Sequence, residues 1–217
     1  MSFSRLYETL VSDIDYGDIE VFLLDHLKKN QGVLDVGCGT GIFSLFLKKQ
    51  GFDVTGIDSD SEMLAMFEEK QRDMQLHIPV FEHDIRKPLN RTFNQMILLN
   101  DVINYFKGVK QVLKNLSNAL ENNGQILIDF YKEEYLSVMK DYVEDEVSPV
   151  VYRWEIFVKH CQMTHQITYK EQVYRFNQYI YPLNYYLDRF KEVGLNSELI
   201  DGPDERKHYV KLTKKDN

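Results

Sequence analysis

Cysteine is scarce in this sequence, and long apolar runs are missing from it. Only Cys38 and Cys161 occur, a number and spacing that indicate neither a disulfide framework nor a zinc site, so we expect no metal and a reducing compartment. No apolar run approaches the ~18 residues of a membrane span. The opening MSFSRLYETL also lacks a basic stretch followed by an apolar core. We therefore expect a cytoplasmic protein without a membrane partner.

Basic residues are outnumbered as well. The chain has 26 Lys and Arg against 34 Asp and Glu, a net charge of −8 at pH 7. Such a chain as a whole repels phosphate backbones, which makes nucleic acid a poor candidate for a substrate unless there is a local basic patch. At 217 residues and 43% hydrophobic, the chain can bury one substantial core with room for an insertion. We predict one domain, residues 1–217.

Three of the eleven glycines alternate in one short segment, VLDVGCGTG at Val33–Gly41. An apolar run that ends in Asp35 and continues through Gly37, Gly39 and Gly41 predicts a strand that turns tightly into a helix. Glycine adopts backbone angles closed to other residues, and without a Cβ it lets a ligand lie against the main chain. Our interpretation is that a ligand, not packing, explains all three.

The spacing of these glycines narrows the ligand. The dinucleotide fingerprint GxGxxG aims a helix N-terminus at a pyrophosphate, whereas this loop reads GxGxG after Asp35. A carboxylate here would repel a pyrophosphate but would suit an ammonium group, such as that of S-adenosylmethionine. A turn without a ligand and a nicotinamide or flavin site are the alternatives. The segment resembles motif I of the class I S-adenosylmethionine-dependent methyltransferases.

That resemblance implies a Rossmann-like, doubly wound α/β fold with a mostly parallel seven-stranded sheet, and S-adenosylmethionine as cofactor. Asp58 ends the strand in DVTGIDSD, 23 residues after Asp35. An acid about 20 residues downstream holds the ribose hydroxyls in such folds. Helix N-capping is the other reading, although Asp60 or Ser59 could fill that role equally well.

Two later strand ends complete the predicted cofactor site. The resemblance assigns the adenine amino group to Asp84 and the ring to the backbone amide of Ile85, and it places Asn100 and Asp101 beside the methionine portion and the methyl acceptor. In the N-terminal segment, a tyrosine hydroxyl at Tyr7 or Tyr16 could reach the cofactor carboxylate. The predicted cofactor-binding residues are Tyr16, Asp35, Gly37, Cys38, Gly39, Gly41, Asp58, Ser59, Asp84, Ile85 and Asn100.

Strands and helices alternate along residues 31–130, which favours parallel βαβ units. The predicted strands are 33–37, 53–58, 78–83, 95–100 and 125–130, and the helices are 41–49, 61–73 and 108–120. We expect Asn122, Asn123 and Gly124 to close the last helix as a left-handed turn. Around this cofactor-binding core we predict a helical lid at 1–30, an antiparallel β insertion at 145–180, and a C-terminal helix with closing strands at 181–217.

Catalysis requires few protein groups, because methyl transfer from a sulfonium needs mainly alignment of the acceptor. A base would help an amine or hydroxyl acceptor, and the candidates are Asp101, Tyr105, His160 and His165. For both histidines, a surface or packed imidazole on the insertion is the other reading.

The fourth strand end reads NDVINYF, which has neither the Asn-Pro-Pro-aromatic run of some family branches nor a Pro-Cys nucleophile. We predict methyl transfer to a nitrogen or oxygen of a small molecule, with segment 145–180 shaping the acceptor pocket or a homodimer contact. One alternative is a non-catalytic S-adenosylmethionine-binding module whose insertion binds a protein. A methyltransferase acting on protein or RNA, and an enzyme of another class using this cofactor or a carboxylated relative, are the others.

Overall fold

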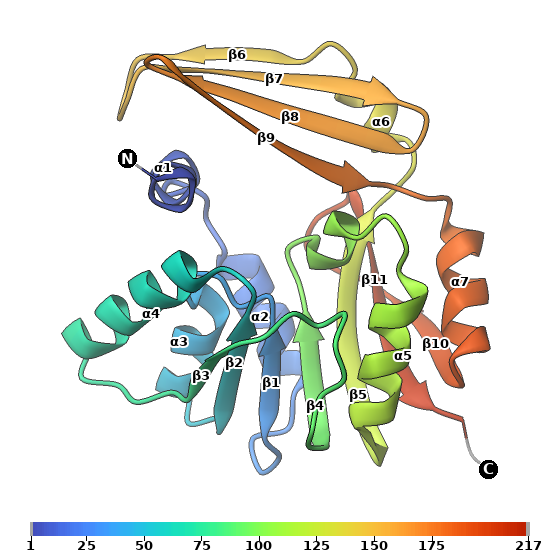
Figure 1. Cartoon of the computed structure of the whole chain (residues 1–217). Coiled ribbons are helices and arrows are strands. Elements are labelled where there is room, and N and C mark those ends of the chain that lie inside the picture. The colour runs from blue at the N-terminus through green and yellow to red at the C-terminus, as the bar shows by residue number, and fades with distance from the viewer. Residues whose placement is uncertain (1, 216–217) are drawn as a thin grey trace.

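A seven-stranded sheet forms the centre of the computed structural model, which describes residues 2–215. Its order is β10-β11-β5-β4-β1-β2-β3, and β11 alone runs against the others. Figure 1 shows the carboxyl ends of the parallel strands at one edge of the sheet. The predicted fold class is confirmed. The strands are β1 (Val33–Val36), β2 (Val54–Asp58), β3 (Val80–Glu82), β4 (Phe93–Leu98), β5 (Leu120–Tyr131), β10 (Leu195–Ile200) and β11 (Lys207–Lys214).

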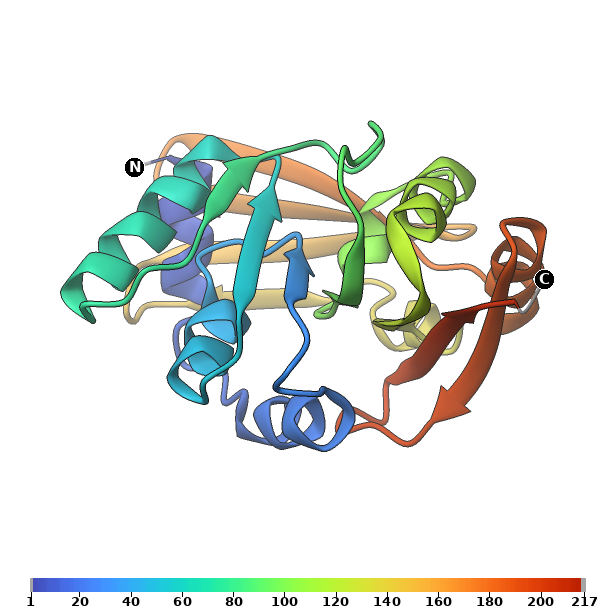
Figure 2. The ribbon, with the colours of Figure 1, turned by 90° about the horizontal axis from the view of Figure 1, so that it is seen from below.

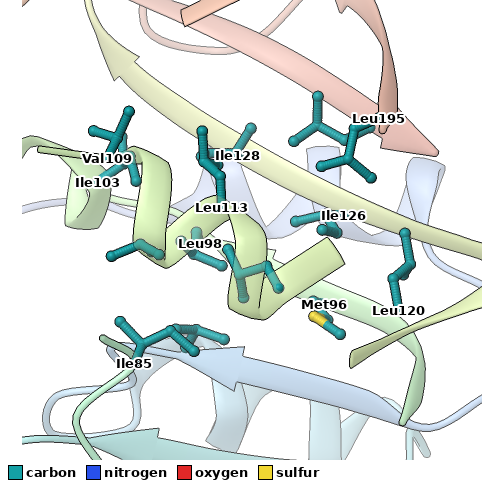
Figure 3. Close-up of a cluster of buried hydrophobic side chains, with 14 of the residues drawn as sticks. Ile85, Met96, Leu98, Ile103, Val109, Leu113, Leu120, Ile126, Ile128 and Leu195 are labelled. Atoms are coloured by element: carbon teal, nitrogen blue, oxygen red, sulfur yellow. The ribbon is translucent and has the colours of Figure 1, made fainter. Parts of the chain in front are cut away.

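Helices cover both faces of this sheet and divide the core in two. Apolar side chains of α2, α3 and α4 pack on one face, and those of α5 and α7 on the other. Figure 3 shows the second cluster, in which Leu113 of α5 lies over Ile126 and Ile128 of β5. The helices are α2 (Gly17–His26), α3 (Ile42–Lys49), α4 (Ser61–Asp73), α5 (Lys110–Ala119) and α7 (Leu183–Glu192), with a 3-10 turn at Val102–Tyr105.

A second, four-stranded antiparallel sheet lies over the carboxyl ends of the parallel strands (Figure 1). Seen from below in Figure 2, its strands pass across behind the larger sheet. It consists of β6 (Val143–Glu146), β7 (Tyr152–Lys159), β8 (Gln162–Tyr169) and β9 (Gln172–Tyr179), and a short helix, α6 (Tyr135–Val138), precedes it. We call these four strands the roof. The helix α1 (Phe3–Leu10) lies between the roof and α4.

Local signals explain most of these elements, and one prediction is wrong. The α4 helix spans the predicted residues because Asp60 caps its start, accepting hydrogen bonds from the amides of Glu62 and Met63 at 2.9 and 3.1 Å. Asn122, Asn123 and Gly124 form no left-handed turn but lie within β5. The α5 helix ends at Ala119, Leu120 turns directly into an extended conformation, and an irregular register follows.

The roof extends beyond what alternation predicted. Strand β6 reads VEDE, a short and strongly acidic segment that carries no strand signal. It forms because it pairs with β7 along Val143↔Glu155 to Glu146↔Tyr152. Within residues 2–215, none of the helices combines the length and the apolar character that a membrane crossing requires.

Candidate functional site

A cavity of about 1480 Å³ separates the roof from the carboxyl ends of the parallel strands. The N-terminal segment borders it on a third side. Of the predicted cofactor residues, nine line the cavity, whereas Asp35 and Gly41 do not. The nine are Tyr16, Gly37, Cys38, Gly39, Asp58, Ser59, Asp84, Ile85 and Asn100.

The three glycines of the loop have positive φ for different structural reasons. A Cβ on Gly37 would lie 2.7 Å from a methyl of Val102, and one on Gly41 would lie 2.4 Å from the ring of Phe67. Our interpretation that a ligand explains all three is therefore wrong for these two, which packing requires. Gly39, at φ +52°, has nothing within 4 Å of its Cβ position. It leaves open space at the cavity wall, an open cradle in which a ligand can lie against the main chain.

Asp58 organises this loop from the end of β2. Its Oδ2 accepts a hydrogen bond from the Gly39 amide at 2.8 Å, and its Oδ1 accepts one from the Asp60 amide at 2.9 Å. Burial raises the pKa of Asp58, and these amides oppose that effect. Because Asp60 caps α4, the N-capping alternative for Asp58 is excluded. A ribose contact by Asp58 stays a prediction.

Asp35 is buried within the protein and does not line the cavity, although we expected it beside the ammonium group of a ligand. It is 3% exposed, and its Oδ2 accepts a hydrogen bond of 2.6 Å from the Ser44 hydroxyl at the start of α3. Burial raises the pKa of Asp35 to about 7. Its side chain therefore ties the strand to the following helix, and its contact with the cofactor ammonium stays a prediction.

At the third strand end, the Arg86 guanidinium binds both carboxylate oxygens of Asp84, at 2.7 to 3.0 Å. These hydrogen bonds lower the pKa of Asp84 to about 2. The carboxylate is thus held ionised at the cavity. Next to it, Ile85 is buried, and its carbonyl accepts a hydrogen bond from Asn115 at 2.8 Å.

The fourth strand end turns sharply, because Asn100 and Asp101 both adopt left-handed backbone angles, with φ 63° and 56°. These residue types tolerate that conformation best among those with a side chain. Asp129 of β5 stabilises the turn by accepting both amides, from Asn100 at 3.0 Å and from Asp101 at 2.6 Å. The turn directs Asp101 into the cavity lining.

A buried lysine balances these carboxylates. The Nζ of Lys207 on β11 lies 2.7 Å from Asp101 and 3.3 Å from Asp129, and only 5% of the residue is exposed. Burial alone lowers the pKa of Lys207, but the two carboxylates outweigh it and hold the pKa above its usual value. The sequence analysis missed Lys207, since its partners are far away along the chain and the strand pattern KHYVKLTK gives no sign of an ion pair.

A series of hydrogen bonds between side chains joins Asp101 to the roof. Gln178 donates to Asp101 Oδ2 at 2.5 Å, and its own Oε1 lies 3.0 Å from Nε2 of His165. Trp154 donates to Nδ1 of the same imidazole at 3.1 Å. Because the indole N–H can only donate, Nδ1 accepts and Nε2 carries the proton. Sequence reasoning missed Gln178 and Trp154, because an alternating strand pattern does not show which side chains bond to each other.

These contacts limit what His165 can do. Burial lowers its pKa to about 4, which keeps it neutral near pH 7, and the ring stacks on Phe176 at 4.4 Å. Both ring nitrogens are engaged, so a base at His165 would require one hydrogen bond to break. That role stays a prediction.

The other candidates differ in their access to the cavity. Tyr105 belongs to the lining and keeps 41% of its surface exposed. His160 lies exposed in the β7–β8 turn and is absent from the lining that the structure describes. Tyr16 precedes α2, contacts Phe43 edge-on at 5.6 Å and lines the cavity, as does Tyr7, whose pKa burial raises to about 12.

The α1 helix is bound on two sides. Glu8 accepts a hydrogen bond of 2.9 Å from Thr40 in the glycine loop and pairs with Lys70 of α4. Ser4 donates to Asp60 at 2.8 Å. On its other side, Leu6 is buried against Ile167 and Tyr169 of the roof. The helix therefore spans the gap beside the glycine loop, and its role as a lid over the cofactor stays a prediction.

Comparison with known proteins agrees with this geometry. The sequence model of a family described as "Methyltransferase domain" matches residues 15–196. A provisionally named methyltransferase of Geobacillus sp. (strain WCH70) is 28% identical over 184 residues, which cover 77% of this chain and 73% of that protein. These similarities extend well beyond the glycine loop.

Solved structures show the same fold. An S-adenosylmethionine-dependent methyltransferase from Clostridium acetobutylicum ATCC 824 superposes with a TM-score of 0.83 at 23% identity, covering 98% of this chain and 97% of that one. An amino pentose methyltransferase from Micromonospora echinaspora with S-adenosylmethionine bound gives 0.76 at 17% identity, covering 99% and 98%. With the open cradle at Gly39 and the acid at the end of β2, this chain belongs to the methyltransferase-domain family and is an S-adenosylmethionine-dependent methyltransferase.

Proposed function

We propose that this enzyme transfers the methyl group to a nitrogen or oxygen of a small molecule, and that the roof forms the acceptor half of the site. The observation that carries the proposal is the single cavity of about 1480 Å³ shared by the parallel strand ends and the roof. Typical small-molecule sites occupy ~300 to 1,000 Å³, so the cavity has room for the cofactor and a small acceptor together.

In this proposal the cofactor is held by the strand-end wall, which is the side of the cavity formed by the carboxyl ends of the parallel strands. Gly39 leaves space for the cofactor against the main chain, and Asp58 accepts hydrogen bonds from the ribose hydroxyls. Asp84 and Ile85 face the adenine ring, and Asn100 lies near the methionine portion. Asp58 would exchange its hydrogen bond to the Gly39 amide for the ribose, or share it, because a carboxylate has about four lone-pair positions. The cofactor, when bound, supplies an activated methyl group on a sulfonium.

The chain's own residues then orient the acceptor and receive its proton. Asp101 stands at the junction of the two walls, held by Lys207 at 2.7 Å and Gln178 at 2.5 Å. Tyr105 is the more exposed group in the same lining. We propose that Asp101 fixes the acceptor by accepting a hydrogen bond from it, and that the proton passes to bulk water, directly or through the Tyr105 hydroxyl, which stays protonated because burial raises its pKa well above the usual value.

Two of the sequence alternatives lose support. A non-catalytic module would be favoured by a filled or closed acceptor pocket, and this cavity is open. An RNA substrate is disfavoured by the net charge of −8.

The test incubates the purified protein with S-adenosylmethionine and panels of small amines, phenols and carboxylates, and measures S-adenosylhomocysteine together with the mass of the methylated product. Turnover of at least one small-molecule class, and loss of it on substitution of Asp101 by Asn, is expected. Turnover confined to a protein or RNA substrate would contradict the proposal.

A further inference from the structure

The cavity carries a large excess of negative charge. Twelve Asp or Glu residues line it, against three Lys or Arg residues. Each of those three cations already has a carboxylate partner: Arg86 binds Asp84, Arg206 binds Asp204, and Lys207 binds Asp101. Among the lining residues that the structure describes, no Lys or Arg lacks a carboxylate partner. A negatively charged small molecule would therefore meet net repulsion and no unpaired counter-charge.

One of the carboxylates, Glu144, belongs to the roof and is held in a fixed orientation. It lies on the cavity face of β6, and the hydroxyls of Tyr142 and Tyr152 each donate to one of its two oxygens. Burial raises the pKa of Tyr142 to about 12, with the hydrogen bond to Glu144 as the next cause, so this hydroxyl remains a donor at neutral pH. Each carboxylate oxygen can accept about two hydrogen bonds, which leaves lone pairs for a ligand.

Aromatic rings surround this carboxylate. The β6–β7 register places Trp154 directly opposite Glu144, and Tyr152 lies one pair further along the same face, opposite Glu146. All four residues line the cavity. Indole and phenol faces attract a cation electrostatically, most strongly where water is partly excluded. A carboxylate flanked by such rings suits an ammonium group, which gains from both.

We propose that Glu144, with Trp154 and Tyr152, recognises a positively charged nitrogen of the methyl acceptor, and that the acceptor class is therefore a cationic amine. This inference rests on the proposed small-molecule function and adds its substrate class. Glu144 acts here as a specificity-determining residue: it holds a charged nitrogen that is not the atom methylated, because an ammonium has no lone pair for the methyl group, and it takes no part in the transfer itself.

The first experiment uses the full chain saturated with S-adenosylhomocysteine, so that the cofactor half is filled. Choline is compared with 3,3-dimethylbutan-1-ol, which has the same shape and no charge. Trp154 is the only tryptophan of the chain, so its fluorescence reports on this part of the cavity. We expect choline to bind saturably and about tenfold or more tightly than the neutral alcohol. Equal binding of the two, or no binding of choline, would overturn the inference.

The second experiment removes the charge but keeps the shape. Glu144→Gln should weaken choline binding about tenfold and leave the neutral alcohol unaffected. Asp145→Asn is the matched control, because Asp145 is the next residue on the same strand, points to the other face and pairs with Arg153 at 2.8 Å. It should leave both affinities unchanged. Unaltered choline binding in Glu144→Gln, with S-adenosylhomocysteine binding intact, would contradict the assignment.

Failure of this inference and failure of the proposed function give different results. Methylation of neutral phenols or carboxylates but not of amines would overturn the role of Glu144 and leave the small-molecule function standing. Selective choline binding that depends on Glu144, without methylation of any small molecule, would overturn the proposed function instead.

Discussion

The strand ends and the roof face each other across one cavity, but they are built in different ways. On the strand-end side, the important contacts join a side chain to the backbone, as in the bonds of Asp58 to the amides of Gly39 and Asp60. On the roof side, they join one side chain to another, as in the series of hydrogen bonds from Asp101 through Gln178 to His165.

This difference explains which half can vary. A backbone cradle at a strand end binds any ligand that fits the turn, so it suits a cofactor shared by a whole family. A network of side chains changes its charge and shape with single substitutions, so it suits an acceptor that differs between relatives. Asp101 connects the two halves, because it lies at a strand end, pairs with Lys207 and accepts a hydrogen bond from Gln178 of the roof.

The strongest test of the backbone cradle is Gly39→Val. The valine would project into the open space beside the loop, and φ +52° would add strain, so we expect S-adenosylmethionine binding to be lost. Calorimetric titration measures it. Gly51→Val is the matched control, since Gly51 has φ +87° and nothing within 4 Å of its Cβ position but lies outside the cavity lining that the structure describes. It should bind normally. If Gly39→Val binds as well as Gly51→Val, the loop does not face the cofactor.

The same difference decides how much the sequence could predict. The glycine loop, the acids at the strand ends and the alternation of strands and helices follow from short-range patterns, and the seven-stranded sheet is implied by the family resemblance of the glycine loop. Lys207, Gln178 and the acidic strand β6 could not be found in this way, because their roles depend on partners that only the folded chain brings close. The function of Gly37 and Gly41 was misread for a similar reason: Val102 and Phe67 reach them from other elements.

The next largest effect concerns the buried ion pair of Lys207 at the strand ends, which holds Asp101 where it meets the roof. Lys207→Met keeps the length of the side chain but leaves Asp101 and Asp129 as uncompensated buried carboxylates. Breaking a buried pair in this way costs about 3 to 5 kcal/mol of unfolding free energy. Urea denaturation measures it. Lys211→Met, on the same strand but in a partly exposed pair with Glu198, should cost at most about 1 kcal/mol. Equal losses of unfolding free energy in the two variants would mean that the buried ion pair stabilises the fold no more than the exposed one.

Acid should weaken the roof through His165. Its pKa of about 4 in the folded state lies below its ordinary value of 6.5, so the unfolded chain binds more protons in this range. Stability is therefore complete above about pH 6.5 and is lost as the pH falls toward 4, by up to about 3 kcal/mol at 1.4 kcal/mol per unit. Thermal unfolding of the wild type and of His165→Gln between pH 4 and 8 measures it. The variant should show a flatter profile, whereas His160→Asn, in the exposed β7–β8 turn, should follow the wild type. Matching profiles for wild type and His165→Gln would refute the coupling.

The smallest of these effects tests whether the strand-end wall binds through side chains as well as backbone. Asp58→Ala removes the proposed ribose acceptor and also the bond that fixes the Gly39 amide at 2.8 Å. Hydrogen bonds to a charged group contribute about 1.5 to 3 kcal/mol, so S-adenosylmethionine should bind roughly ten- to a hundredfold more weakly. Asp53→Ala, at the exposed residue just before the opposite end of β2, is the control and should bind as the wild type does. Because the Gly39 cradle stays open in Asp58→Ala, binding should be weakened but not abolished. Unchanged affinity would leave the backbone alone responsible for the cofactor, and complete loss would mean that Asp58, more than the glycine, shapes the loop.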